Sequence, residues 1–303
     1  MTEHPIIEVR DFRMRFGDQV VIDDLSFDVH AGETFGLLGS NGCGKTTTIR
    51  ALLGIYEPTA GSLLVEGRRF DPAQGSRLGY LPEERGLYRK ESVLEVMTYF
   101  GRLKGLSRDA ASGWSKEYLR RVDLADHAKV RLDKLSGGQQ QKVQLGVTIM
   151  NAPSILILDE PTKGFDPVNR RLLMDLVDEQ RAQGSTVVMV THQMDEVERL
   201  CDRILLLKDG RARAYGTVAQ VQDSFGGRRM RLTFSGVLPA SPSYRVAVSE
   251  RNYAELDLAE DVEPSAVVRE LLDAGVQLRG FETARVSLEE IFLKVYGERE
   301  AAA

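Results

Sequence analysis

The stretch from Gly39 to Thr46 fits the pattern G-x-x-x-x-G-K-[ST], and it limits the fold of this chain more than any other feature. It lies between the apolar run Thr34–Leu38 and the helix-like segment Thr46–Leu53. Glycines let such a loop turn so that successive backbone N–H groups point inward, and the helix that follows directs its positive end to the same place. We expect Lys45 to reach the β- and γ-phosphates of a nucleotide and Thr46 to offer its hydroxyl to Mg²⁺. The motif therefore predicts a strand, a phosphate-binding loop and a helix in succession.

Bulk composition excludes several other classes of protein. The 303 residues allow one large or two ordinary domains, and 42% hydrophobic residues suffice for a packed core. A formal net charge of -5 provides no basic field, so we expect no direct nucleic-acid partner. Two cysteines, Cys43 and Cys201, build no disulfide framework, which favours a reducing cytosol. Residues Met1–Arg10 do not resemble a signal peptide, and no apolar run approaches the roughly 18 residues of a membrane span.

The order of apolar segments predicts an α/β fold, with a P-loop NTPase sheet, an antiparallel β subdomain and a helical insertion. Short alternating segments precede the phosphate loop, at Ile6–Val9, Val20–Ile22 and Leu25–Val29. Compact apolar runs that alternate with helix-length stretches such as Val168–Gln183 indicate a doubly wound parallel sheet; these runs are Ser154–Leu158, Thr186–Val190 and Arg203–Leu207.

Two further regions complete the predicted organisation. Between residues 84 and 150 the pattern is mostly helical, clearest at Ser92–Leu103 and Ser115–Val122, and we interpret it as the insertion. After Phe225 strand-like and helix-like segments follow in a new pattern, which predicts a small C-terminal α+β domain. The expected domains are residues 1–225 and 226–303, and Ala301–Ala303 is expected to be frayed.

Acidic residues stand at the end of one predicted strand and a histidine at the end of another. Asp159 and Glu160 directly follow the buried run Ser154–Leu158. Asp159 is expected to position Mg²⁺ and Glu160 to face the attacking water. Taken alone, two such acids can simply cap a turn. His192 follows the strand Thr186–Val190 and is expected at the carboxyl edge of the sheet, where ligands of open α/β folds bind.

A second predicted anion site lies far from the first in the sequence. Ser136-Gly137-Gly138-Gln139 precedes a helix with apolar residues at helical spacing. In isolation this tetrapeptide can be ordinary helix capping. Because one nucleotide has a single γ-phosphate, two phosphate-binding helix ends facing one ligand most simply mean two chains that share it.

These motifs together resemble the ATP-binding subunits of ABC transporters. The phosphate loop, Leu135–Gln139, Asp159-Glu160, Gly164-Phe165-Asp166 and Thr191-His192 occur in that family's order, over about residues 6–220. The resemblance implies ATP and Mg²⁺ as cofactors and gives the site residues their expected roles. Lys45 and Thr46 match the Walker A lysine and threonine, Asp159 the Walker B aspartate, Glu160 the catalytic glutamate, His192 the switch histidine, Asp166 the D-loop aspartate and Phe16 the aromatic that stacks on adenine. The expected nucleotide-binding set is Phe16, Gly39, Ser40, Asn41, Gly42, Cys43, Gly44, Lys45, Thr46, Thr47, Ser136, Gly137, Gly138, Gln139 and Asp166; the expected metal set is Thr46, Glu83 and Asp159.

Three positions depart from the pattern of that family. Glu83 stands where these subunits usually have glutamine, after Tyr80-Leu81-Pro82. A carboxylate can still contact Mg²⁺, and we expect Glu83→Gln to change the Mg²⁺ concentration that gives half-maximal turnover. In the D-loop, Lys163 stands where serine is commoner and Phe165 where leucine is commoner.

The resemblance also implies partners and a location. It predicts hydrolysis of ATP in a head-to-tail homodimer, or in a heterodimer with a sister ATPase, that drives a separately encoded membrane permease from the inner, cytoplasmic face of the membrane. Residues Gly79–Tyr88, the domain after Phe225 and the closing Ser287–Phe292 resemble a bacterial subgroup that serves efflux-type permeases. An alternative is a soluble ATPase of the same class that acts as a clamp on nucleic acid or ribosomes, and a small-molecule kinase is a third. Co-purification with an integral membrane protein, with ribosomes or DNA, or a phosphorylated acceptor would distinguish the three.

Cys43 is the last residue for which the sequence suggests a property. A thiol in a loop rich in N–H groups at the start of a helix is expected to have a lowered pKa and to react with thiol reagents. The alternative is that Cys43 is a small filler in a tight loop.

Overall fold

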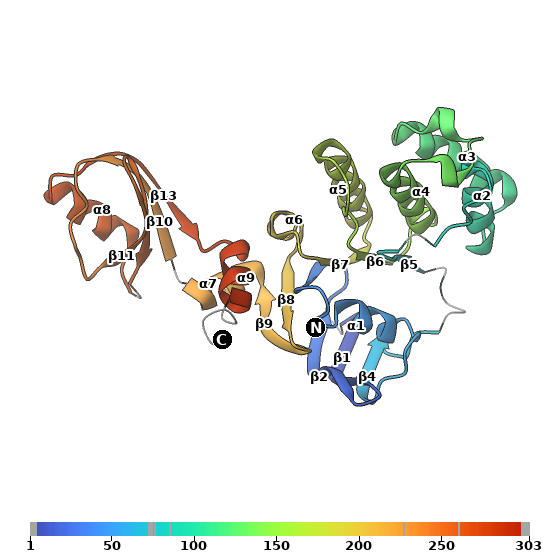
Figure 1. Cartoon of the computed structure of the whole chain (residues 1–303), viewed down its shortest axis with the longest axis horizontal. Helices are drawn as coiled ribbons and strands as arrows, with labels where there is room; N and C mark the ends of the chain where they lie inside the picture. The colour runs from blue at the N-terminus through green and yellow to red at the C-terminus, as the bar shows by residue number, and fades with distance from the viewer. Residues whose placement is uncertain are drawn as a thin grey trace. The chain divides into compact units, whose positions relative to one another are not determined.

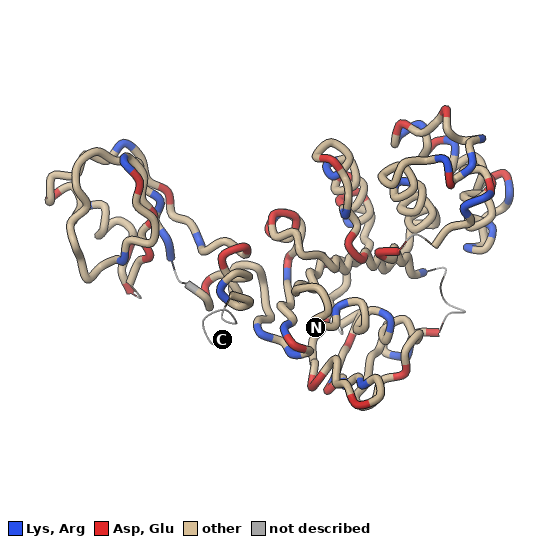
Figure 2. The backbone as a smooth tube through the Cα atoms, in the orientation of Figure 1, with Lys and Arg blue, Asp and Glu red and all other residues tan. Residues whose placement is uncertain are grey.

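The computed structural model describes residues 5–71, 75, 77–84, 86–226, 228–259 and 261–297. The chain divides into two compact units, Met1–Tyr215 and Gly216–Ala303, and each is described by itself. In Figure 1 the first unit runs from blue to yellow and the second from yellow-orange to red. Lysine and arginine are interspersed with aspartate and glutamate along the backbone of both units (Figure 2).

A six-stranded sheet forms the centre of the first unit. Its strands lie in the order β5-β6-β7-β3-β8-β9, and the first five of these are parallel to their neighbours. The bounds are β3 (Thr34–Leu38), β5 (Leu78–Leu81), β6 (Ile155–Asp159), β7 (Thr186–Thr191), β8 (Arg203–Lys208) and β9 (Arg211–Thr217). Every residue of β3, β6 and β7 is buried, as expected of the inner strands of a parallel sheet. The loops after β3, β5, β6 and β7 therefore leave the same edge of the sheet.

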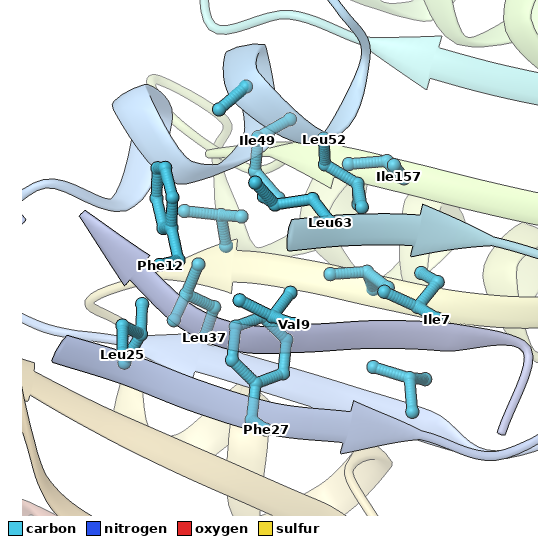
Figure 3. Close-up of a cluster of buried hydrophobic side chains, with 14 of the residues drawn as sticks. Ile7, Val9, Phe12, Leu25, Phe27, Leu37, Ile49, Leu52, Leu63 and Ile157 are labelled. Carbon is cyan, nitrogen blue, oxygen red and sulfur yellow. The ribbon is translucent and has the colours of Figure 1, made fainter. Parts of the chain in front are cut away.

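A three-stranded antiparallel sheet packs against the central one. Its order is β2-β1-β4, with β1 (Ile7–Phe16), β2 (Gln19–Val29) and β4 (Ala60–Val65). Figure 3 shows the core between them, where Val9 and Phe27 from this sheet face Leu37 of β3. Helix α1 (Lys45–Leu52) adds Ile49 and Leu52 to the same core, so the helix that follows the phosphate loop is held firmly by apolar packing.

The insertion lies between β5 and β6 in the sequence and consists of helices. Figure 1 draws them in teal and green, and they contact one another: α2 (Val93–Leu103), α3 (Arg108–Arg121) and α4 (Gly137–Ile149), with 3₁₀ turns η2 (Ala125–His127) and η3 (Leu132–Lys134). The expected helix Ser115–Val122 begins earlier, at Arg108, because Ser107 caps it by accepting from the Ala110 N–H. Two more helices, α5 (Pro167–Ala182) and α6 (Met194–Leu200), follow β6 and β7.

The second unit is a small antiparallel sheet with three helices among its described residues. Its strand order is β11-β12-β10-β13. The bounds are α7 (Val218–Gly226), β10 (Arg228–Ser235), β11 (Tyr244–Glu250), β12 (Tyr253–Leu258), α8 (Pro264–Asp273), β13 (Gln277–Arg285) and α9 (Leu288–Gly297). Met230 and Leu256 of the sheet pack with Val267 and Leu271 of α8 in a core of their own. The fold class thus agrees with the sequence prediction.

The boundary between the units differs from the expected one by ten residues. We expected it after residue 225, which would have placed α7 in the first unit. Helix α7 instead contacts β13 and α9, Asp223 pairs with Arg285, and Lys294 donates to the Phe225 carbonyl. These contacts assign α7 to the second unit. The prediction for Ala301–Ala303 lies outside the described residues.

Candidate functional site

Glycine is required in the loop between β3 and α1 by its backbone conformation. Gly42 and Gly44 have φ angles of 80° and 111°, in the region that other residues rarely adopt. A Cβ added to Gly44 would also lie 2.3 Å from Cδ1 of Ile22. Helix α1 begins directly after Gly44 with no side chain capping its first N–H groups. Those N–H groups and the positive end of the helix are therefore available to an anion.

The Lys45 ammonium lies back against this loop. Its Nζ donates to the carbonyl oxygens of Gly39, at 2.7 Å, and Ser40, at 3.1 Å, and the residue is 7% exposed. An ammonium has three donors, so Lys45 has a further N–H to direct toward a phosphate.

Thr46 and Asp159 meet at the edge of the sheet. The Thr46 hydroxyl donates to Oδ2 of Asp159 at 3.0 Å, while the buried Oδ1 of Asp159 has no hydrogen-bond partner. Burial raises the pKa of Asp159 to about 6, the hydrogen bond from Thr46 opposes this shift, and the neighbouring carboxylates of Glu83 and Glu160 add to it. A buried, unpartnered carboxylate oxygen beside a hydroxyl fits Mg²⁺, which usually takes one or two protein ligands and completes its shell with phosphate and water. In the described part of the chain, no three His, Cys, Asp or Glu side chains group as a metal site by themselves.

Glu160 and His192 come together from the ends of the adjacent strands β6 and β7. Oε1 of Glu160 lies 2.9 Å from Nδ1 of His192, and the Glu160 N–H donates to the Val190 carbonyl. Glu160 has a φ of 49°, which is uncommon outside glycine, and it is 6% exposed. This backbone conformation, held by the neighbouring strand, fixes the carboxylate at the edge of the sheet.

Lys45, Thr46, Asp159 and Glu160 border a hollow that we call the loop hollow, with a volume of about 320 Å³; His192 does not belong to its lining. It is lined by Asn41, Gly42, Gly44, Lys45, Thr46, Thr47, Glu83, Asp159 and Glu160. Phe16 is not part of this lining. It stands 46% exposed at the end of β1, and its ring meets that of Tyr56 edge to face at 5.3 Å.

Ser136–Gln139 and Asp166 border a different hollow, which we call the signature hollow. Its volume is about 370 Å³, and it is lined by Ser136, Gly137, Gly138, Gln139, Lys142, Gly164, Phe165, Asp166 and Asn169. Ser136 caps α4 in a reciprocal pair with Gln139, and Asp166 caps α5 by accepting from the Asn169 N–H at 2.9 Å. The two hollows have no lining residue in common.

Two residues that line the signature hollow, Lys142 and Asn169, were not singled out in the sequence. Gly164 and Phe165 belong to a motif found in the sequence but not to the predicted nucleotide-binding set, and they also line this hollow. Phe165 packs over Gly138, where an added Cβ would lie 3.5 Å from the ring. No local pattern marks Lys142 or Asn169, because they come together only after α4 and α5 have folded.

The expected lowered pKa of Cys43 is wrong. The side chain is buried in the core beneath the loop, and this burial raises the pKa of its thiol above the ordinary value. The nearby Lys45 charge and backbone N–H groups act in the opposite direction but do not outweigh burial. The second interpretation, a small filler in a tight loop, agrees with the structure.

The parallel sheet with a glycine-rich loop between β3 and α1 defines a P-loop nucleotide-binding protein. Residues 22–163 match the family described as ABC transporter, and residues 216–296 match the C-terminal domain of DrrA1-3-like ATP-binding proteins. The chain is 44% identical over 217 residues to the uncharacterized ABC transporter ATP-binding protein MJ1023 of Methanocaldococcus jannaschii, covering 72% of this chain and 79% of that protein. It is 40% identical over 214 residues to the Nod factor export ATP-binding protein I of Burkholderia lata, covering 69% and 70%.

A solved structure agrees with these relatives. It is described as the ATP binding subunit of an ABC transporter, and it matches with a TM-score of 0.67 and 31% identity over 73% of this chain and 93% of that chain. The chain therefore belongs to the ABC transporter ATP-binding proteins, a family that binds ATP.

Proposed function

We propose that this chain is the ATP-hydrolysing motor of an ABC transporter and that two copies pair head to tail around two ATP molecules. The observation that carries the proposal is the presence of two separate hollows on one chain. The loop hollow offers Lys45 and the start of α1 to phosphate, and the signature hollow offers the start of α4. In a two-fold head-to-tail pair, the loop hollow of each copy faces the signature hollow of the other.

The chemistry that we propose uses groups already held in place. Glu160 orients or deprotonates the attacking water, and His192, whose Nδ1 lies 2.9 Å from Oε1 of Glu160, contacts the γ-phosphate. Lys45 and the loop N–H groups stabilise the charge that develops on the transferred phosphoryl group. Mg²⁺, held by Thr46, Asp159 and Glu83, supplies further positive charge to the phosphates when it is bound.

We also propose that the motor drives a separately encoded permease, in the direction of export. Exposed aromatic and aliphatic side chains on the helical insertion support a docking place for a helix of that permease: Tyr88 is 57% exposed, Tyr99 43% and Leu103 64%. Tyr99 and Leu103 border a hollow of about 650 Å³ at the end of α2. The described residues contain no helix that combines the length and hydropathy of a membrane span. The relative named for Nod factor export supports the direction.

Mixing two inactive variants tests whether both copies build each site. Lys45→Ala removes the phosphate lysine, and Gly137→Asp places a carboxylate at the start of α4, where it supports the helix but repels phosphate. Each variant alone has both sites broken. A mixed pair has one of its two ATP sites intact, and half of the pairs in an equimolar mixture are mixed. The mixture should therefore recover about a quarter of the parent turnover. If the mixture stays as inactive as its components while each variant remains folded, hydrolysis does not depend on a shared site.

A further inference from the structure

Two of the three positions that depart from the family pattern, Glu83 and Lys163, contact each other. Nζ of Lys163 lies 2.6 Å from Oε1 of Glu83, although 80 residues separate them in the sequence. Glu83 follows β5 and Lys163 follows β6, and these strands are parallel neighbours. Both loops therefore leave the same edge of the sheet, where a carboxylate and an ammonium replace the two neutral residues that are usual in the family.

This ion pair joins a residue of the loop hollow to the segment that leads to the signature hollow. Glu83 lines the loop hollow together with Asp159 and Glu160, so three carboxylates gather there. Lys163 directly precedes Gly164–Asp166, which line the signature hollow. Segment 160–166 therefore begins at one hollow and ends at the other, and Lys163 fastens its middle to Glu83.

The pair is too exposed to contribute much to the stability of the fold. The side chains of Lys163 and Glu83 are 62% and 38% exposed. Exposed pairs of this kind contribute at most about 1 kcal/mol, and a stronger partner displaces them easily. The contact with Lys163 instead affects the position of the Glu83 carboxylate and partly neutralises its negative charge at the loop hollow.

We propose that Lys163 is a positioning residue for Glu83, and that their ion pair opens when nucleotide with its divalent cation enters the loop hollow. The inference rests on the proposed function. Before binding, Lys163 neutralises one of the three carboxylates that would repel phosphate. With a divalent cation bound beside the nucleotide, Glu83 would turn to it and release Lys163, and segment 162–166 would be free to rearrange at the signature hollow. Nucleotide binding in the loop hollow thereby affects the signature hollow of the same chain. In the head-to-tail pair, that signature hollow contacts the second nucleotide.

The test is a double-mutant cycle on the full chain. The first quantity measured is the affinity for ATP in EDTA and 0.15 M salt, where no turnover occurs. Lys163→Ser leaves Glu83 uncompensated and should weaken metal-free ATP binding about threefold, as an exposed charge pair allows. In the Glu83→Gln background the same Lys163→Ser change should have no effect, because the charge that it compensates is gone and longer-range effects are screened. The Mg²⁺ concentration that gives half-maximal turnover should be lower in Lys163→Ser than in the parent. In the Glu83→Gln background, Lys163→Ser should not change this concentration.

Two control variants keep the result specific. Lys163→Arg preserves the pair and should behave like the parent. Arg69→Ser breaks another exposed 2.6 Å pair, with Glu57, outside both hollows, and should change neither quantity. The inference is overturned if Lys163→Ser has no effect on ATP affinity, or if its effect is equal in both backgrounds, which would mean that Lys163 acts on the nucleotide directly. A parent chain that binds no ATP would instead overturn the proposed function.

Discussion

Asp159 bears the main electrostatic conflict of the loop hollow. It is 1% exposed, one of its oxygens has no hydrogen-bond partner, and Glu83 and Glu160 stand nearby. Without a cation, the folded chain therefore holds a carboxylate whose ionisation is unfavourable. This unfavourable ionisation accompanies a carboxylate that is already in place to bind a divalent cation, and it should make the stability of the metal-free protein depend on pH.

We expect the metal-free protein to lose stability as the pH rises from about 4 to 6. The pKa of Asp159 is 3.8 in its ordinary state and about 6 in the fold, so in this window the folded chain binds a proton that the unfolded chain has released. Between pH 5 and 7.5, the parent should lose about 1 kcal/mol of unfolding free energy relative to Asp159→Asn. Urea unfolding of both in EDTA at the two pH values measures this. A difference between the two proteins that does not change with pH would contradict the burial of an ionised Asp159.

Both cysteines should be unreactive in the folded protein. Cys43 is 6% and Cys201 9% exposed, and burial raises the pKa of each thiol, that of Cys201 to about 12. With a chromogenic thiol reagent at pH 7.5 we expect slow reaction of the native chain, with or without ATP, and fast reaction of both thiols in denaturant. Rapid labelling of Cys43 that ATP suppresses would restore the earlier expectation of an activated thiol.

At the residue scale the sequence identified what local patterns can identify. Lys45, Thr46 and Asp159 stand in contiguous motifs, and the structure brings them to one hollow. The partner of Glu83 could not be found in this way, because Lys163 approaches it only through the pairing of β5 with β6. The prediction of a lowered pKa for Cys43 was wrong because the sequence indicates the N–H groups that favour the thiolate but not the burial that outweighs them.

At the scale of elements, the buried strands were the easiest to predict. β3, β6 and β7 are continuous apolar runs that lie inside a parallel sheet. β9 and α7 were missed because polar and charged residues interrupt their apolar pattern, as Arg211 and Arg213 do in β9. Because α7 was not predicted, the expected domain boundary fell after residue 225 instead of before Gly216.

Helix α7 provides the test of that boundary. The fragment 216–297 has its own core and should unfold in one cooperative transition. Val221, 2% exposed in α7, is the position to probe: Val221→Ala should lower the fragment's unfolding free energy by about 1–2 kcal/mol. Val237→Ala, at a residue that is 87% exposed, is the control and should be neutral. Equal stability of fragments 216–297 and 226–297 would return α7 to the first unit.

At the scale of the whole molecule, the proposed function requires that each ATP be bound by the loop hollow of one chain and the signature hollow of another. The loop hollow holds Glu160 and the signature hollow holds Ser136, with no residue in common. Sequence reasoning predicted this arrangement from the count of phosphate-binding helix ends, since the start of α1 and the start of α4 both have the character of anion sites. The sequence could not predict the volumes of the hollows or the link between them through Lys163, because both arise from packing.

The most direct test of the account is the mass in solution of Glu160→Gln with and without saturating ATP. Removing the carboxylate should reduce turnover by about 10²–10⁴ while ATP binding is retained, so that the closed state accumulates. We predict a monomer without nucleotide and a dimer with ATP, and no dimer when Lys45→Ala is added. A Glu160→Gln chain that binds ATP fully and yet remains monomeric would contradict the shared site on which the proposed function rests.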